Sequence, residues 1–292
     1  MFVEEIKPNG FCGGVKNAIK KITKHIDNFK KPVYMLGYLI HNKYVISALK
    51  ELGIIVLDCS EESANKIESG TAIITAHGVS KKIYTILKDK DIDIVNTTCY
   101  NVQKIHEIVE RKINENYNVY IIGKESHPEI KGILGISDNV KIYSDINLKE
   151  KAFICNQTTL NYKTLNETFN EIKKKNPTAE INNEVCSATR ERQEAIRNNA
   201  YKYDLIIVVG DTLSNNTDSL YKVCLEEGVS SIKVETLDDI NKYDLSKYKN
   251  VGITSGASTP KVFLDEIKNA LLTYDKNIIY KSNINIIDLL KI

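Results

Sequence analysis

Short apolar runs alternate with longer amphipathic segments along the whole chain. The runs are rich in Ile and Val and lie at 33–36, 54–57, 72–75, 119–122, 152–155, 205–209 and 251–254, with a weaker one at 140–143. Segments with helical spacing fall between them, for example 15–25, 102–114 and 188–199. Apolar runs that alternate with helical patterns are typical of βα units, whose parallel strands are buried on both faces. The pattern therefore predicts an α/β fold.

Three cysteines repeat the same local context at one interval. Cys12, Cys99 and Cys186 each follow an apolar run and precede a helical pattern, and neighbouring cysteines are 87 residues apart in both intervals. Self-similarity at a fixed period indicates repeated structural units. We therefore predict three α/β modules, at residues 1–98, 99–185 and 186–292, the last including a tail from 275 to 292 that has no counterpart in the other two.

Polar side chains follow the predicted strands in each module. Ligands of open α/β sheets bind at the carboxyl ends of strands, so these residues are the candidates for a site. They are His41 and His77 in the first module, His127, Glu129 and Thr158 in the second, and Ser214, Asn215, Asn216 and Ser258 in the third. The distances along the chain from Cys12 to His41, Cys99 to His127 and Cys186 to Ser214 are 29, 28 and 28 residues. We expect each module to contribute one thiol and the polar residues of two strand ends to a common site.

Composition and charge narrow the class of ligand. Charged residues make up 27% of the chain and the net charge is +2, so no field of one sign points to nucleic acid or to a membrane surface. The first residues lack the basic and apolar segments of a signal peptide. A cytoplasmic protein with a small-molecule ligand is expected, and its six cysteines should be reduced thiols rather than disulfides.

The repeated cysteines suit a metal centre. A thiolate at the start of a helix is stabilised by unpaired N–H groups and by the helix dipole, which favours ligation. Three soft ligands without an obvious fourth fit a 4Fe-4S cluster with one open iron, held by Cys12, Cys99 and Cys186. The remaining cysteines, Cys59, Cys155 and Cys224, are interpreted as small apolar side chains.

The histidines and hydroxyl groups suit an anion. His41, His77 and His127 could donate hydrogen bonds to it, while Ser214, Asn216 and Ser258 are either helix N-caps or further donors. Neither a Walker loop nor a G-x-G-x-x-G motif occurs, which favours a diphosphate over a nucleotide. Glu129 could carry a proton at neutral pH if burial raised its pKa, with Thr158 and Thr159 as relays. His25 and His106 fall inside helical patterns and are expected to be solvent-facing or hydrogen-bonded.

Taken together, the motifs resemble those of the 4-hydroxy-3-methylbut-2-enyl diphosphate reductase family. The matching stretches run in the family's order from residue 10 to residue 260: Gly10-Phe11-Cys12-Gly13-Gly14-Val15, Ile40-His41-Asn42, Ala76-His77-Gly78-Val79, Thr98-Cys99, His127-Pro128-Glu129, Gln157-Thr158-Thr159, Cys186-Ser187-Ala188-Thr189, Arg192-Gln193-Glu194-Ala195 and Gly256-Ala257-Ser258. Two positions depart from the family pattern. Tyr100 stands where proline usually follows the second cysteine, and Asn215 stands where a second serine usually precedes the asparagine.

The resemblance implies a trilobed fold with pseudo-threefold symmetry around a 4Fe-4S cluster. It implies reductive dehydroxylation of 4-hydroxy-3-methylbut-2-enyl diphosphate to isopentenyl and dimethylallyl diphosphate with release of water. It assigns catalysis to Glu129, Thr158 and His127, and substrate binding to His41, His77, His127, Thr158, Ser214, Asn215, Asn216 and Ser258. It also implies an external electron donor of the ferredoxin or flavodoxin type, and three modules that enclose one site favour a monomer.

Three other functions fit parts of the pattern. A quinolinate synthase also has three modules and three cysteines, although the three histidines and His127-Pro128-Glu129 favour the diphosphate reductase. A redox sensor or cluster carrier would use the cysteines and leave the polar strand ends as helix caps. A zinc-binding structural protein would hold no iron.

Overall fold

The computed structural model describes residues 1–144 and 151–292, and contacts divide the chain into two compact units. We call residues 1–16, 41–48 and 187–292 the N/C unit, and residues 17–40 and 49–186 the central unit. Two helices, α1 (Gly13–Thr23) and α2 (Lys43–Glu51), have residues in both units.

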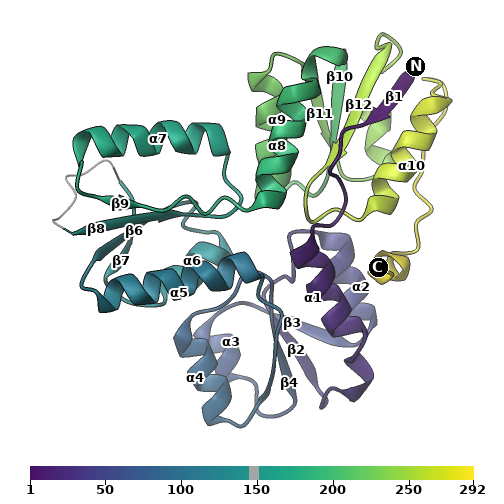
Figure 1. Cartoon of the computed structure of the whole chain (residues 1–292). Coiled ribbons are helices and arrows are strands. Elements are labelled where there is room, and N and C mark those ends of the chain that lie inside the picture. The colour runs from purple at the N-terminus through teal and green to yellow at the C-terminus, as the bar shows by residue number, and fades with distance from the viewer. Residues whose placement is uncertain (145–150) are drawn as a thin grey trace. The chain divides into compact units, whose positions relative to one another are not determined.

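The N/C unit is built on one parallel sheet with helices on both faces (Figure 1). Its strand order is β1-β12-β10-β11, with bounds Phe2–Glu5, Asn250–Ser255, Leu205–Val209 and Ser230–Val234. All five side chains of β10 are buried, and alternate residues enter different apolar clusters. Ile206 and Val208 pack with α8 (Ser187–Asn199) and α9 (Asn215–Glu226), while the others pack with α10 (Lys261–Leu272). This two-sided burial explains why β10 reads as a continuous apolar run.

The C-terminal tail covers the α10 side of this sheet. Leu289 is buried in the same cluster as β10 and α10, and Tyr280 and Ile286 pack against that cluster. Backbone N–H groups of the tail donate to side chains of the unit, from Ser282 to Asp238 Oδ2 at 2.9 Å and from Asn283 to Glu266 Oε1 at 3.0 Å. The tail, which ends in the 3-10 helix Ile286–Leu290, is therefore part of the core of the N/C unit.

The central unit contains two further parallel sheets. The first has the order β3-β2-β4-β5, with bounds Ile54–Leu57, Val33–Leu36, Thr71–Ile74 and Asp93–Asn96. Residues of β4 pack with α3 (Glu61–Asn65) and α4 (Lys81–Asp89) in one buried cluster. The N-terminal caps of both helices are serines, Ser60 and Ser80, whose hydroxyl groups accept hydrogen bonds from backbone N–H groups in the first turn.

The second sheet of the central unit has the order β7-β6-β8-β9. Its strands are Val140–Ile142, Asn118–Ile122, Ala152–Asn156 and Glu180–Ile181. One face packs on α5 (Tyr100–Asn114) and α6 (Pro128–Leu134), and the other on α7 (Tyr162–Lys175), as Figure 1 shows. Alternation again separates the faces, because Val119 and Ile121 enter one cluster and Tyr120 enters the other.

The three sheets share one topology. Read from the strand that precedes each repeated cysteine, the orders are β1-β12-β10-β11, β5-β4-β2-β3 and β9-β8-β6-β7. The N-terminal strand β1 pairs with β12 and supplies the cysteine-preceding edge of the last sheet. The predicted α/β fold with three parallel βα sheets is confirmed; the module boundaries at 98 and 185 stay a prediction.

Four of the described strands have no counterpart among the predicted runs: β1, β5, β9 and β11. All four lie at the edge of their sheets. An edge strand has one unpaired side and more exposed side chains, as the half-exposed pattern of β11 illustrates. Its hydrophobic signal is therefore weaker than that of a central strand.

Candidate active site

Each repeated cysteine is held in the same way. The backbone N–H of Cys12 donates to the carbonyl of Ala257 at 3.0 Å, that of Cys99 to Ala76 at 3.0 Å, and that of Cys186 to Thr158 at 3.1 Å. Each of these carbonyls lies two residues beyond the end of the neighbouring strand, which is β12, β4 or β8. The sheet topology thus places each of the three repeated cysteines beside the carboxyl end of the neighbouring strand in its sheet, where ligands of such sheets bind.

The three cysteines also begin helices and remain accessible. Helices α1, α5 and α8 start at the residue after Cys12, Cys99 and Cys186, and each thiol is partly exposed. The other cysteines lie in different surroundings. Cys155 and Cys224 are buried, and burial raises the pKa of the Cys224 thiol to about 11 and that of Cys155 further. Cys59 is partly exposed, but burial raises its pKa as well. The predicted division between accessible and apolar cysteines is confirmed for Cys155 and Cys224.

Within the central unit, two of the predicted histidines lie together. The rings of His77 and His127 are 5.4 Å apart between centroids and stand edge to face. His77 follows β4 and His127 follows β6, so both come from carboxyl ends of strands, as predicted. His127 is buried, and its Nδ1 accepts the backbone N–H of Glu129 at 3.3 Å. This bond leaves the Nε2 side of the His127 ring as its other hydrogen-bonding edge.

Glu129 is a buried carboxyl group beside Thr158. Only 2% of Glu129 is exposed. The backbone N–H of Thr158 donates to Oε1 at 2.8 Å and its hydroxyl donates to Oε2 at 2.9 Å. Burial raises the pKa of Glu129 to about 7, although the two hydrogen bonds from Thr158 favour the charged form. Glu129 can therefore both hold and release a proton near neutral pH.

Buried polar residues that no motif singled out support the Cys186 segment. Asn156 ends β8 and is fully buried, and its Oδ1 accepts the backbone N–H of Glu184 at 2.8 Å. The Glu184 carboxylate in turn pairs with Lys104 of α5 at 3.1 Å. The signal for Asn156 was a polar residue that ends the apolar run at 152–155. These contacts join the chain before Cys186 to the helix that follows Cys99.

Within the N/C unit, three predicted ligand residues share hydrogen bonds. The Ser258 hydroxyl donates to the carbonyl of His41 at 3.1 Å and lies 3.2 Å from the hydroxyl of Ser214. Ser214 is also the N-cap of α9, accepting the N–H of Thr217 at 3.3 Å. Ser214 is thus a helix N-cap, and the same hydroxyl oxygen also lies against Ser258.

Asn216 is bound to the protein on both sides of its amide. Its Nδ2 donates to Thr189 Oγ1 at 3.0 Å and its Oδ1 accepts the N–H of Ala257 at 3.0 Å. Ala257 is the residue whose carbonyl accepts the N–H of Cys12. Asn216 therefore supports the Cys12 segment, whereas its neighbour Asn215 is partly exposed at the start of α9. Arg192 adds a second support, donating from Nη2 to the carbonyl of Gly10 at 2.8 Å.

His25 is exposed, as expected. His106, which was also expected to be solvent-facing or hydrogen-bonded, lies in a different environment. The Nε2 atom of His106 is buried without a hydrogen-bond partner among residues 1–144 and 151–292. Its ring packs between two glycines, since a Cβ built on Gly78 or Gly132 would lie 3.5 or 3.4 Å from Cε1. Gly78 follows His77, and Gly132 lies in the helix that begins after His127. Residues distant in sequence pack around His106 and determine its environment. A helical pattern contains no information about such packing.

Acid should destabilise the protein partly through His106. Burial lowers the pKa of His106 from 6.5 to about 4. The nearby charge of Lys81 also lowers this pKa slightly, whereas that of Glu110 raises it, by less than burial lowers it. Between these values only the unfolded chain binds the proton, so stability falls as pH drops through 6.5 towards 4. From pH 7 to pH 5 we expect a loss of about 2 kcal/mol in the free energy of unfolding from this group. Urea titrations should show this loss reduced in His106→Gln and unchanged in His25→Gln; equal pH dependence in all three proteins would contradict the assignment.

The sequence matches the family described as LytB protein over residues 3–272. A curated relative from Bacillus cereus (strain AH820), named 4-hydroxy-3-methylbut-2-enyl diphosphate reductase, is 38% identical over 94% of this chain and 91% of its own length. The chain belongs to the LytB family. The family predicted from the motifs is therefore confirmed, as is the expectation of a reductase.

Solved structures agree with this placement in the LytB family. The structure titled E-1-hydroxy-2-methyl-but-2-enyl-4-diphosphate reductase from Plasmodium falciparum matches with a TM-score of 0.88 and 29% identity, over 94% of this chain and 89% of that one. A second, titled (E)-4-hydroxy-3-methyl-but-2-enyl diphosphate reductase, the terminal enzyme of the non-mevalonate pathway, matches with a TM-score of 0.68 and 29% identity, over 94% and 100%. Within the described part of the chain, no helix has the length and apolarity needed to cross a bilayer.

Proposed function

We propose that this LytB protein is a 4-hydroxy-3-methylbut-2-enyl diphosphate reductase. The carrying observation is the buried carboxyl of Glu129, bonded twice to Thr158 and with a pKa of about 7. A group of this kind suits a reaction that must deliver protons at neutral pH. The names of relatives that match the chain along nearly its whole length support the substrate.

We infer that Cys12, Cys99 and Cys186 hold a 4Fe-4S cluster. The residues fit such a group: each thiol is partly exposed, each directly precedes a helix, and each backbone N–H is tied to a strand-end carbonyl. Helix N-termini favour the thiolate form that binds iron. When bound, the cluster supplies electrons and one Lewis-acidic iron toward the substrate hydroxyl.

The diphosphate of the substrate is assigned to the polar strand-end residues. His41, Ser214, Asn215, Asn216 and Ser258 of the N/C unit offer ring nitrogen, hydroxyl and amide donors, and Asn216 also supports the Cys12 segment. His77 and His127 of the central unit lie 5.4 Å apart between ring centroids, close enough for one anionic group to receive hydrogen bonds from both.

The proton balance assigns a role to Glu129. Conversion of the allylic alcohol to isopentenyl or dimethylallyl diphosphate consumes two electrons and two protons, breaks one C–O bond, forms one C–H bond and releases water. The Thr158 hydroxyl, 2.9 Å from Glu129 Oε2, can pass a proton between the carboxyl and the substrate. Burial of Glu129 and His127 excludes bulk water from these two groups.

We infer from the family that the electrons come from a donor outside the chain. We assign this role to a reduced ferredoxin or flavodoxin. We further propose that the enzyme acts as a monomer in the cytoplasm.

Anaerobic purification followed by two measurements tests the function. Iron and sulfide analysis with electron paramagnetic resonance should show a cluster whose signal changes when 4-hydroxy-3-methylbut-2-enyl diphosphate is added to the reduced protein. With dithionite as reductant, product analysis should then show isopentenyl and dimethylallyl diphosphate. A cluster signal that does not change when the substrate is added would refute the proposal. Turnover of iminoaspartate and dihydroxyacetone phosphate instead of this substrate would also refute it.

A further inference from the structure

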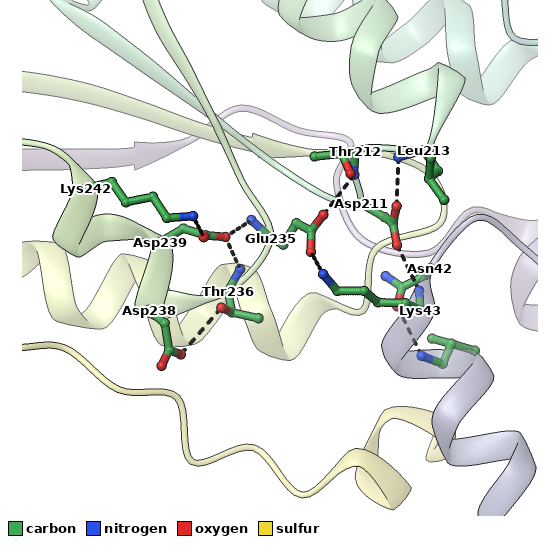
Figure 2. A network of polar contacts seen from close by, with 11 residues as sticks. Asn42, Lys43, Asp211, Thr212, Leu213, Glu235, Thr236, Asp238, Asp239 and Lys242 are labelled. Carbon is green, nitrogen blue, oxygen red and sulfur yellow. Dashed lines mark hydrogen bonds and ion pairs between the residues drawn. The ribbon is translucent and has the colours of Figure 1, made fainter.

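Asp211 lies two residues beyond the end of β10, and its carboxylate joins two distant segments of the N/C unit (Figure 2). Its Oδ2 accepts the backbone N–H of Lys43 at 2.9 Å, and its Oδ1 accepts that of Leu213 at 2.8 Å. Only 4% of Asp211 is exposed. Charge-assisted bonds from backbone N–H groups to a buried carboxylate are among the stronger hydrogen bonds in proteins. The carboxylate is therefore a rigid bridge between residues 43 and 213.

The two bridged segments carry ligand residues of the proposed site. Lys43 comes two residues after His41 and begins α2, and Leu213 directly precedes Ser214. Ser258 joins the same segments a second time, through the carbonyl of His41 and the hydroxyl of Ser214. We propose that Asp211 is a positioning residue for the diphosphate-binding residues His41, Ser214 and Ser258, an inference that rests on the proposed function.

The backbone at the end of β10 gives Asp211 little freedom to move. A Cβ on the preceding Gly210 would collide with the hydroxyl groups of Thr217 and Thr259. Only glycine fits there, which brings β10 close against the first turn of α9. Asp211 thus leaves the strand from a fixed point, and its carboxylate reaches the first backbone N–H of α2.

A second carboxylate completes the network but contributes less. Glu235 Oε1 accepts the backbone N–H of Thr212 at 3.1 Å, and its other oxygen forms an ion pair with the ammonium of Lys43 (Figure 2). The Lys43 side chain is 58% exposed and that of Glu235 is 12% exposed, so solvent screens this ion pair from the lysine side and weakens it. Asp211, which is buried and accepts two backbone N–H groups, is the stronger connection.

The negative charge of Asp211 allows a positioning role to be distinguished from an electrostatic one. A negative charge beside an anion site disfavours the anion by electrostatics alone. Asp211→Asn removes that charge, but its amide offers only one acceptor oxygen for two N–H donors. A positioning role predicts weaker diphosphate binding in this variant, whereas a purely electrostatic or structural role predicts equal or tighter binding.

Calorimetric titration with inorganic diphosphate tests the inference without turnover. We expect the Kd of Asp211→Asn to rise about tenfold, with KM for the substrate rising in parallel and kcat within about twofold of the wild type. Asp204→Asn is the matched control. Asp204 precedes β10 and also accepts two backbone N–H groups, from Lys249 at 3.0 Å and Asn250 at 2.9 Å, but at the amino end of the strand. Its variant should bind diphosphate like the wild type.

A second variant, Asp211→Ser, allows the same measurement if Asp211→Asn does not fold. Asp211→Ser keeps a short acceptor near Leu213 but cannot also reach Lys43, so it should weaken diphosphate binding in the same direction. Binding at wild-type affinity or tighter in whichever Asp211 variant folds would overturn the inference, as would equal weakening in Asp204→Asn. Binding of inorganic diphosphate requires no electron transfer, so it can be measured even in a protein without reductase activity. Absence of reductase activity in the wild type would therefore refute the proposed function without affecting the binding test.

Discussion

Replacing Cys99 with serine is expected to abolish turnover and strongly reduce bound iron and sulfide. A serine hydroxyl is a hard ligand that stays protonated at neutral pH, so it does not replace a thiolate on a soft iron–sulfur cluster. Three cysteines are proposed to hold the cluster, and removal of one leaves two. The measurement is iron and sulfide per chain together with visible absorbance, on protein purified without oxygen. Circular dichroism should confirm that the variant is folded.

Cys59→Ser is the matched control for this prediction. Cys59 is also partly exposed and also lies between a strand, β3, and a helix, α3. Burial raises the pKa of its thiol, however, and it is not one of the cysteines spaced at 87 residues. The control should retain iron and activity. A Cys99→Ser protein with the wild-type iron content would exclude Cys99 as a ligand, and equal losses in both variants would remove the distinction between repeated and other cysteines.

Glu129→Gln should lower kcat by about 10²–10⁴ while leaving the cluster and substrate binding in place. Glutamine has nearly the same shape and keeps an acceptor for the N–H of Thr158, but it has no exchangeable acid proton at neutral pH. The loss should therefore appear in kcat rather than in KM. Steady-state kinetics with dithionite as reductant measures both constants, and paramagnetic resonance with substrate reports binding independently.

The pH profile gives this prediction a second readout. The pKa of Glu129 is raised to about 7, so the fraction that carries a proton falls as the pH rises above that value. If Glu129 acts as the acid, kcat of the wild type should decline about tenfold per pH unit in the alkaline range. Glu129→Gln should lack this decline. Glu180→Gln is the control, because Lys112 lowers the pKa of that exposed carboxylate and keeps it ionised. A full alkaline decline in Glu129→Gln would assign the proton to another group.

Central strands were predictable because local sequence reports their environment. Residues 205–209 are apolar throughout, and the strand is buried on both faces and paired on both sides. The edge strand β1 was not predictable in this way. It consists of Phe2, Val3, Glu4 and Glu5, and it is a strand because β12, which lies about 250 residues further along the chain, offers it a free edge. Pairing between distant segments leaves no periodic signal in either segment alone.

For the site, the sequence alone determined which residues are candidates, because residue type and position after a strand follow from local pattern. It thus singled out the repeated cysteines, the strand-end histidines and Glu129. Only the tertiary structure decided their states and supports. The pKa of Glu129 depends on burial and on Thr158, 29 residues away. The Asp211 bridge spans 168 residues, and His106 packs between two glycines from other elements with its Nε2 atom buried. Burial and long-range hydrogen bonds arise only when distant segments meet, so no local pattern contains them.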